Sequence, residues 1–214
     1  MQRRQFSARL AAAAAGLSLL GNARAQGAPA EGKEYIKVSP PVPVTPPPGK
    51  VDVIEFFSFA CPHCFAFEPP LEAWTRRLPA NVHFHRVPVP FLFNADNFQR
   101  LYFTLEAMNL VEAMQLKVFN AVHVDHQRLD SPESIGALMT KNGVDAAKFL
   151  SVFNSFGMHT KVAQAKQLVE AYKLDQVPML AVQGRFMTSP GHAAGADRAL
   201  QVADWLVQQV AAGH

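Results

Sequence analysis

The sequence is poor in cysteine and in charged residues. Two of its 214 residues are cysteine, and 17% are charged. Two cysteines form at most one internal disulfide, so a small scaffold held together by several disulfides is excluded. A chain of this length, one domain or one domain with an insertion, buries about 70% of its unfolded surface and needs no metal to fold. The hydrophobic share of 49% is that of a globular protein, which argues against a disordered, collagen-like or polytopic membrane chain.

The first 25 residues have the pattern of an export signal. Arg3, Arg4 and Arg9 precede an apolar stretch over residues 10–20, which is too short to span a bilayer as a helix. Residues 23–25 read Ala-Arg-Ala, an A-x-A cleavage pattern. We therefore expect residues 1–25 to be a signal peptide cleaved near Ala25, with an uncleaved anchor as the alternative. The paired arginines leave both the general and the twin-arginine export route open.

A surplus of basic residues is absent once this leader is set aside. It holds four of the 20 Lys and Arg and none of the 17 Asp and Glu. The remaining chain has 16 basic and 17 acidic residues, a net charge of −1, although the whole chain carries +3. A nucleic-acid-binding surface needs a basic stripe, so we expect no nucleic-acid partner. Export also places the two cysteines in an oxidising compartment.

The hydrophobic pattern predicts an α/β chain. Residues 51–59 form a near-continuous apolar run, which is typical of a strand buried on both faces. Before it, residues 40–48 contain six prolines and are predicted to form an extended connecting arm. A short strand is expected over residues 35–38. The order after it is strand, helix, strand, helical block, hairpin and helix, over residues 51–59, 62–78, 82–87, 97–172, 178–187 and 195–210. A kink is expected at Pro69 and Pro70.

The chemical centre is the sequence Cys61-Pro62-His63-Cys64, at the junction of the buried strand and the first helix. A helix N-terminus presents unpaired N–H groups and a partial positive charge, which favour a thiolate at Cys61. A protonated or donating His63 favours it further. Cys64 lies one turn later and is expected to be less exposed. Because a stabilised thiolate stabilises the reduced form, we interpret the pair as a dithiol–disulfide exchange site biased toward oxidising other thiols.

Other interpretations of the two cysteines are weaker. Haem attachment needs histidine after the second cysteine, where this chain has Phe65. A structural disulfide would close a loop too small to restrict the unfolded chain. A zinc site needs two further ligands, and the candidates are His83, His85, His123 and His126. Zinc remains an alternative, although Cys-x-x-Cys at a strand–helix junction is more typical of redox chemistry.

The residues 53–64, Val-Ile-Glu-Phe-Phe-Ser-Phe-Ala-Cys-Pro-His-Cys, resemble the DsbA family of thiol–disulfide oxidoreductases. Pro62 and His63 are the pair typical of this family between the cysteines, where thioredoxin has Gly-Pro. Further similarities lie in residues 32–35, 153–156 and 176–178. The resemblance implies an α/β thioredoxin fold with an inserted helical domain. The domains expected from it are an N-terminal strand and arm over 26–50, a thioredoxin-like domain over 51–96 and 174–214, and an inserted helical domain over 97–173.

The resemblance also implies roles for three residues outside the Cys-x-x-Cys motif. Pro178 would be a cis-proline facing the disulfide, and the backbone of Val177 would pair with the substrate chain. Glu55, an acid within the apolar strand, matches an acid beneath the active site. Burial should raise its pKa, and it could accept or relay the proton of Cys64; a solvent-facing carboxylate at the strand end is the alternative. Its lysine partner is not identifiable, with Lys50 and Lys37 as candidates.

The expected function is that of an exported oxidase with a redox-active disulfide and no cofactor or metal. Cys61 would exchange with the thiols of reduced, unfolded exported polypeptides in the periplasm, and Cys64 would resolve. A quinone-linked membrane partner resembling DsbB would reoxidise the pair. An apolar rim is expected at Phe59, Phe65, Met179 and residues 190–192. The alternatives are an isomerase or reductase, against which the short N-terminal segment favours a monomeric oxidase, and a metal-binding module using Cys61, His63 and Cys64.

Overall fold

The computed structural model describes residues 27–213, so the predicted signal peptide lies outside the described residues. The described chain alternates strands and helices as the sequence predicts. Its elements are β1 (Ile36–Lys37), β2 (Val51–Phe57), α1 (Pro62–Thr75), β3 (Val82–Pro88), α2 (Ala95–Ala107), α3 (Val111–His123), α4 (Pro132–Lys141), α5 (Ala146–Phe153), α6 (Phe156–Ala171), β4 (Met179–Val182), β5 (Phe186–Thr188) and α7 (Ala196–Ala211). Over residues 27–213, no helix combines the length and hydropathy needed to cross a membrane.

The strands form one five-stranded sheet in the order β1-β5-β4-β2-β3. Strand β2 pairs in parallel with β3, in a register that runs from Val51 opposite Val82 to Phe57 opposite Pro88. It pairs antiparallel with β4 on its other side. All seven residues of β2 are buried, which confirms the central strand predicted from the apolar run. The strand ends at Phe57, two residues earlier than expected, and residues 58–61 form the turn into α1.

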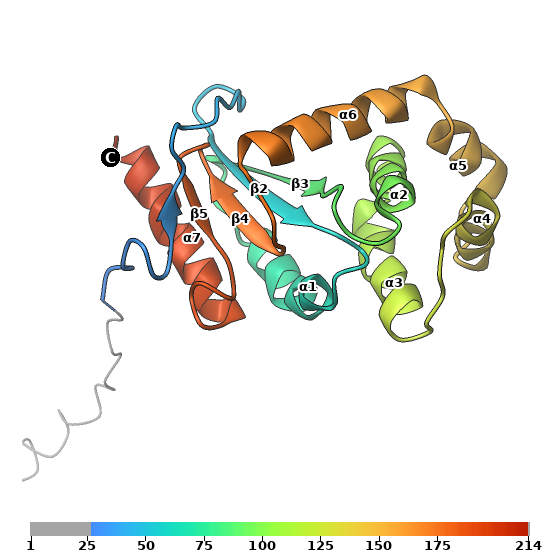
Figure 1. The fold of residues 1–214 in the computed structure, drawn as a ribbon, viewed down its shortest axis with the longest axis horizontal. Helices are drawn as coiled ribbons and strands as arrows, with labels where there is room; N and C mark the ends of the chain where they lie inside the picture. Colours follow the sequence, from blue (N-terminus) through green and yellow to red (C-terminus); the bar gives the residue numbers. More distant parts are fainter. Residues whose placement is uncertain (1–26, 214) are drawn as a thin grey trace, which may run out of the picture.

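Helices cover both faces of the sheet (Figure 1). On one face, Phe67, Leu71 and Trp74 of α1 and the apolar side of α7 pack on alternate residues of β2 and β4. On the other face, the end of α6 packs on β2, where the rings of Tyr172 and Phe56 lie 5.1 Å apart. A strand covered on both faces is expected to be largely apolar, and residues 51–57 are apolar except for Asp52 and Glu55.

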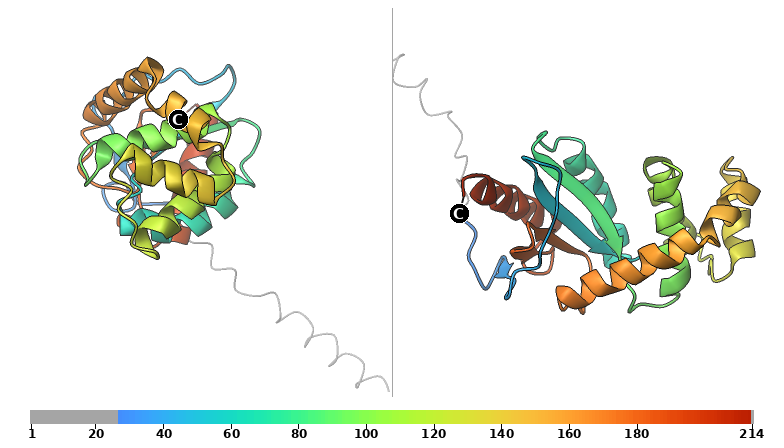
Figure 2. Two further views of the ribbon diagram at one scale, coloured as in Figure 1. Left: turned by 90° about the vertical axis from the view of Figure 1, so that its right-hand side faces the viewer. Right: turned by 90° about the horizontal axis from the view of Figure 1, so that it is seen from above.

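Five helices, α2 to α6, lie between β3 and β4 in the sequence. Seen from above, α2 to α5 occupy one end of the molecule and the sheet with α1 and α7 the other (Figure 2). Helix α4 is capped by Ser131, whose side chain accepts from the N–H of Ser134 in a capping box, with Pro132 at the first helical position. The predicted helical block is thus several helices.

The hairpin between β4 and β5 holds the proline-rich arm. Its turn contains Gly184 at a φ of +65°, and a Cβ there would collide with the carbonyl oxygen of Val42. The N–H of Val42 donates to the carbonyl oxygen of Gly184 over 2.9 Å. Glycine is therefore required both by the turn and by the close approach of the arm. Residues 40–48 connect β1 to β2 across this hairpin.

Candidate redox-active site

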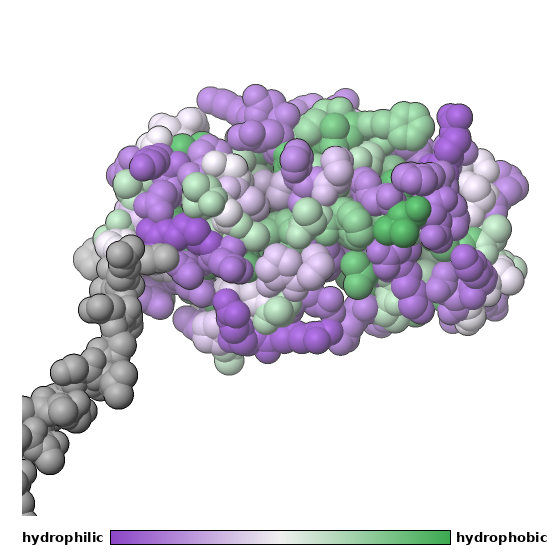
Figure 3. Space-filling view, turned by 90° about the horizontal axis from the view of Figure 1, so that it is seen from below, coloured by the Kyte–Doolittle hydropathy of each residue, from purple (hydrophilic) through white to green (hydrophobic). Residues whose placement is uncertain are grey.

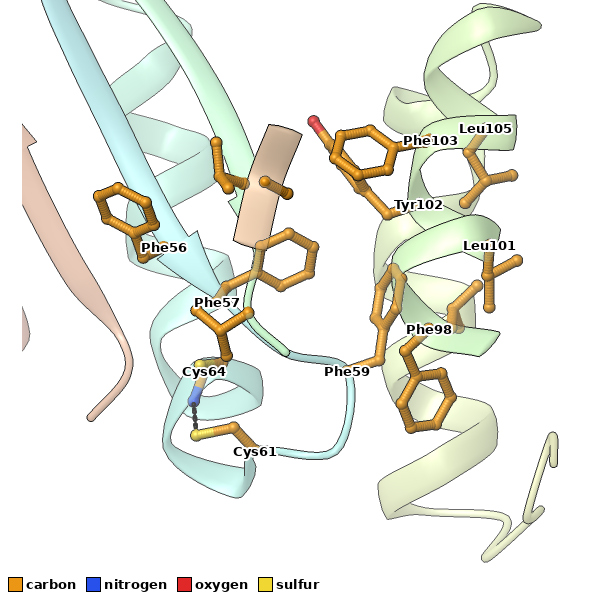
Figure 4. Packing of buried hydrophobic residues seen from close by; sticks show 14 of the residues in the cluster. Phe56, Phe57, Phe59, Cys61, Cys64, Phe98, Leu101, Tyr102, Phe103 and Leu105 are labelled. Carbon is orange, nitrogen blue, oxygen red and sulfur yellow. Dashed lines mark hydrogen bonds between the residues drawn. The ribbon is translucent and has the colours of Figure 1, made fainter. Parts of the chain in front are cut away.

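The two cysteines lie where β2 gives way to α1 (Figure 4). Cys61 is the N-cap residue of α1, with extended backbone angles, and its sulfur accepts from the N–H of Cys64 over 3.3 Å. Pro62 occupies the first helical position, where its missing N–H costs no hydrogen bond. Both cysteines are unbridged. The sequence around the motif thus builds a helix start whose free N–H groups converge on one sulfur.

The two sulfurs have opposite electrostatic surroundings. The pKa of Cys61 is lowered from its usual 9.0 to about 6, above all by a hydrogen bond from the Cys64 thiol. The N–H groups of Cys64 and His63 and the charge of His63 lower it further, against an opposing effect of burial. The pKa of Cys64 is raised by burial, by its hydrogen bond to Cys61 and by the negative charges of Cys61 and Glu55. Cys61 is therefore suited to attack and to leave as a thiolate, and Cys64 to keep its proton.

The loop before β4 faces Cys61. The Val177–Pro178 peptide bond is cis, as the resemblance implies. The Cys61 thiol donates to the carbonyl oxygen of Val177 over 3.5 Å. Val177 is half-buried and Pro178 is buried. The structure thus brings residues separated by more than a hundred positions to one sulfur.

Glu55 lies beneath the cysteines in a buried charge network. It is fully buried, and one of its carboxylate oxygens accepts from Nε of Arg86 over 2.7 Å. Another nitrogen of Arg86 donates to Glu68 of α1 over 2.8 Å. The second carboxylate oxygens of Glu55 and Glu68 are buried and have no hydrogen-bond partner. One guanidinium therefore serves two carboxylates, and the solvent-facing alternative for Glu55 is wrong.

Full ionisation of this buried network is energetically unfavourable. Two ionised carboxylates and one guanidinium leave a net negative charge in a region that excludes water. Burial raises the pKa of Glu55 to about 7; Arg86 opposes the shift, and Glu68 and Cys61 add to it. Burial also raises the pKa of Glu68. Burial thus favours the protonated form of both carboxyl groups, and the charge of Glu55 also acts on Cys64.

Arg86 and Glu68 were not predicted from the sequence. The suggested partners of Glu55 are wrong, because Lys37 pairs with Glu31 at the surface and Lys50 is exposed. The pairing of Arg86 with Glu55 could have been predicted from the sequences of β2 and β3. Strands β2 and β3 have equal lengths and align end to end, which places Arg86 directly opposite Glu55. An arginine directly opposite an acid on a paired strand is its expected partner.

His63 is exposed at the first turn of α1, and its effect on Cys61 is secondary to that of Cys64. We expect His63→Ser to raise the pKa of Cys61, because it removes a nearby positive charge. Cys64→Ala should raise it more, because it removes the thiol that donates to the Cys61 sulfur. A titration of ultraviolet thiolate absorbance in both variants measures this order. An unmoved pKa in His63→Ser, or a larger shift there than in Cys64→Ala, would contradict it.

The predicted apolar rim is partly wrong. Phe59 and Met179 are buried in the core, since the Phe59 ring points toward α2 and packs near Phe98 (Figure 4). Phe65 is half-buried and stacks on His123, with ring centroids 5.1 Å apart. Seen from below, the surface carries hydrophobic areas over its middle and right among hydrophilic ones (Figure 3). The large hydrophobic side chains exposed among residues 27–213 are those of Phe91, Phe93, Leu116, Val124 and Phe156.

The histidines suggested as further zinc ligands do not gather with the cysteines. Within residues 27–213, one group of three His, Cys, Asp or Glu side chains has the spacing to hold an ion, and it contains neither cysteine. Two of the suggested histidine ligands, His83 and His85, belong to that group with Asp52. His123 instead contacts the carbonyl oxygen of Phe59 over 2.8 Å.

Comparisons with known proteins agree with this chemistry. Residues 80–207 match the family model described as a DSBA-like thioredoxin domain. The thiol:disulfide interchange protein DsbA of Bordetella pertussis is 42% identical over 98% of this chain and 99% of its own. That of Pseudomonas aeruginosa is 39% identical over 90% of each chain. The crystal structure of Pseudomonas aeruginosa DsbA superposes with a TM-score of 0.83, covering 86% of this chain and 96% of its own.

Proposed function

The chain belongs to the DsbA family and is a thiol:disulfide oxidoreductase with a thioredoxin-like fold, and from this premise we propose that it introduces disulfide bonds into newly exported polypeptides. The observation that carries the proposal is the contrast between the two sulfurs. Cys61 has a lowered pKa and is 6% exposed, whereas Cys64 is fully buried with a raised pKa. An oxidant needs this contrast, because the Cys61 thiolate stabilises the reduced enzyme and so favours transfer of the disulfide to the substrate.

The reaction transfers two electrons from the substrate to the enzyme. A substrate thiolate attacks the Cys61 sulfur of the disulfide, the bond between Cys61 and Cys64 breaks, and a mixed disulfide forms at Cys61. A second substrate thiolate then attacks the substrate sulfur of that mixed disulfide. Cys61 leaves as a thiolate, the substrate keeps the new disulfide, and the enzyme is left with both cysteines reduced. The lowered pKa of Cys61 makes this second departure fast.

Glu55 is proposed to manage the proton of Cys64. In the first step the Cys64 sulfur leaves as a thiolate in a fully buried position, where its negative charge is unfavourable. Glu55, with its pKa raised to about 7, can hold a proton at neutral pH and give it to that sulfur. In reoxidation the proton moves the other way. Arg86 and Glu68 act as positioning residues, because they hold Glu55 and share its charge.

Val177 and Pro178 are proposed to bind the substrate backbone. The Val177 carbonyl lies 3.5 Å from the Cys61 sulfur. An extended substrate that pairs with this backbone would present its cysteine to Cys61 without any requirement on its side chains. This suits an enzyme with many substrates. We further propose that residues 1–25 direct the chain to the periplasm and that a quinone-linked membrane protein resembling DsbB reoxidises the cysteines.

The proposed direction is tested by equilibrating the enzyme with reduced and oxidised glutathione and by following oxidation of a reduced, unfolded substrate. We expect the Cys61–Cys64 disulfide to be more oxidising than the glutathione couple and to be transferred stoichiometrically. A disulfide that stays intact in excess reduced glutathione would overturn the oxidase and favour a reductase. Faster repair of scrambled disulfides than oxidation of thiols, together with a tight dimer in size-exclusion chromatography, would favour an isomerase.

A further inference from the structure

A cluster of one carboxylate and two imidazoles lies at the opposite end of β2 from the cysteines. Asp52 is the second residue of β2, and His83 and His85 lie on the neighbouring edge strand β3. The parallel register places Asp52 directly opposite His83, and His85 two residues along projects from the same face. About five residues of β2 at about 3.3 Å each separate Asp52 from the strand end that leads to Cys61.

Both imidazoles converge on one oxygen. His83 Nδ1 lies 3.1 Å and His85 Nε2 lies 3.2 Å from Oδ1 of Asp52. The three ligand atoms all lie within 4.8 Å of one another. Two ligand atoms on a tetrahedral ion with bonds of about 2.0 Å are about 3.3 Å apart, so the two N···O separations already fit. The two nitrogens lie at most 4.8 Å apart and would move toward this separation when an ion binds.

The rigidity and exposure of the cluster also suit an ion. Asp52 is buried, and its backbone is held on both sides by Gln183, whose side-chain oxygen accepts from the Asp52 N–H and whose own N–H donates to the Asp52 carbonyl. The two histidine side chains are 39% and 33% exposed, which leaves a path for the ion from solvent. The carboxylate is thus a fixed anchor, and the imidazoles are free to close on the ion.

From this juxtaposition we propose that Asp52, His83 and His85 bind a divalent transition-metal ion of the zinc class, separate from the redox-active cysteines. Two neutral imidazoles and one carboxylate form a donor set that suits Zn²⁺ and its neighbours and does not suit Mg²⁺ or Ca²⁺. Three protein ligands leave a fourth position for water. The bound ion would join the edge strand β3 to the central strand β2.

The test uses untagged protein with Cys61 and Cys64 oxidised to the disulfide, so that neither thiol binds metal. Calorimetric titration with zinc chloride is expected to give one Zn²⁺ per chain, with Mg²⁺ unable to compete. His83→Gln, His85→Gln and Asp52→Asn should each weaken Zn²⁺ binding at least about tenfold, since each removes one of three ligands. Cu²⁺ bound in place of Zn²⁺ should give an electron paramagnetic resonance spectrum with two coupled nitrogens, and one nitrogen in each histidine variant.

The matched control is His126→Asn, which removes an exposed histidine outside the cluster. His126 has a positive φ of 54°, a conformation that asparagine tolerates. Zinc binding should be unchanged in this variant. Circular dichroism without metal verifies that each ligand variant is folded. The proposal is overturned if the oxidised protein binds no Zn²⁺, or if the double variant His83→Gln, His85→Gln binds it as tightly as the wild type; the cluster is then only a hydrogen-bonded link between two strands.

Discussion

Cys61→Ser is expected to lower the rate of substrate oxidation to that of the uncatalysed reaction, whereas Cys64→Ser is expected to accumulate a mixed disulfide. The two cysteines differ because Cys61 alone combines a lowered pKa with proximity to the Val177 backbone. Serine at position 61 leaves no sulfur that a substrate can attack. Serine at position 64 leaves the Cys61 thiolate able to attack oxidised glutathione, releasing one reduced glutathione, but removes the sulfur that would resolve the product.

The trapping reaction should follow the ionisation of Cys61. Since its pKa is about 6, the rate at which Cys64→Ser forms the mixed disulfide should be constant above neutral pH and should fall as the pH drops through about 6. Serine retains a hydroxyl that can donate to the Cys61 sulfur, so the low pKa should be largely kept in this variant. Mass spectrometry of samples quenched with acid measures the adduct. A midpoint near the usual 9.0 would show that the helix start does not stabilise the thiolate.

The size of this stabilisation also predicts how pH affects the reduced enzyme. The interval between 9.0 and about 6 corresponds to about 4 kcal/mol in favour of the thiolate form. Because the folded pKa is the lower one, this contribution to the stability of the reduced protein is complete above pH 9 and is lost as the pH falls through about 6. The disulfide form has no thiol to ionise and lacks the contribution. Relative to a thiol couple of ordinary pKa such as glutathione, the enzyme should therefore be more oxidising at neutral pH than in acid.

Local chemistry made much of the site predictable from the sequence. The Cys-x-x-Cys motif, the apolar strand before it and the helix after it are neighbours in the chain, so their geometry follows from propensities and capping. The cis peptide bond before Pro178 could be predicted only from the family resemblance, because nothing within a few residues of Pro178 specifies it. Burial of Glu55 could be expected from the apolar residues on both sides of it. The order of the elements followed from the change between strand and helix periodicity.

The parts of the site that could not be predicted from the sequence depend on contacts between distant segments. Arg86 reaches Glu55 across a strand pair separated by 31 positions, and Glu68 reaches Arg86 from the inner side of a helix. Neither contact has a local signature. Phe59 was expected at the surface because it precedes Cys61, yet the turn after β2 directs its ring toward the helices between β3 and β4. Hydrophobic side chains next to an active site are divided between core and rim by the packing of other elements.

Arg86→Met is expected to lower the free energy of unfolding by about 3–5 kcal/mol, the effect of leaving a buried charge without its partner. Arg86 is the guanidinium within hydrogen-bond distance of both Glu55 and Glu68, and methionine is an apolar side chain of similar length. Urea unfolding of the oxidised protein at pH 8 measures the change. The control Arg76→Met removes an exposed arginine that is paired with Glu72 on the surface of α1, and should cost less than about 1 kcal/mol.

The effect of Arg86→Met should depend on pH in a direction that identifies its cause. Without Arg86 the pKa values of the two buried carboxyl groups rise further above their usual range, so the folded variant binds protons that its unfolded chain releases. The variant should therefore regain stability as the pH is lowered from 8 toward 5, and the difference from the wild type should narrow. Glu55→Gln with Glu68→Gln in the same chain should restore stability at pH 8, because no buried charge remains to be compensated. If Arg86→Met is equally destabilising at both pH values and the glutamine substitutions do not rescue it, Arg86 contributes through packing. The role proposed for Arg86 in compensating the charge of Glu55 and Glu68 is then wrong.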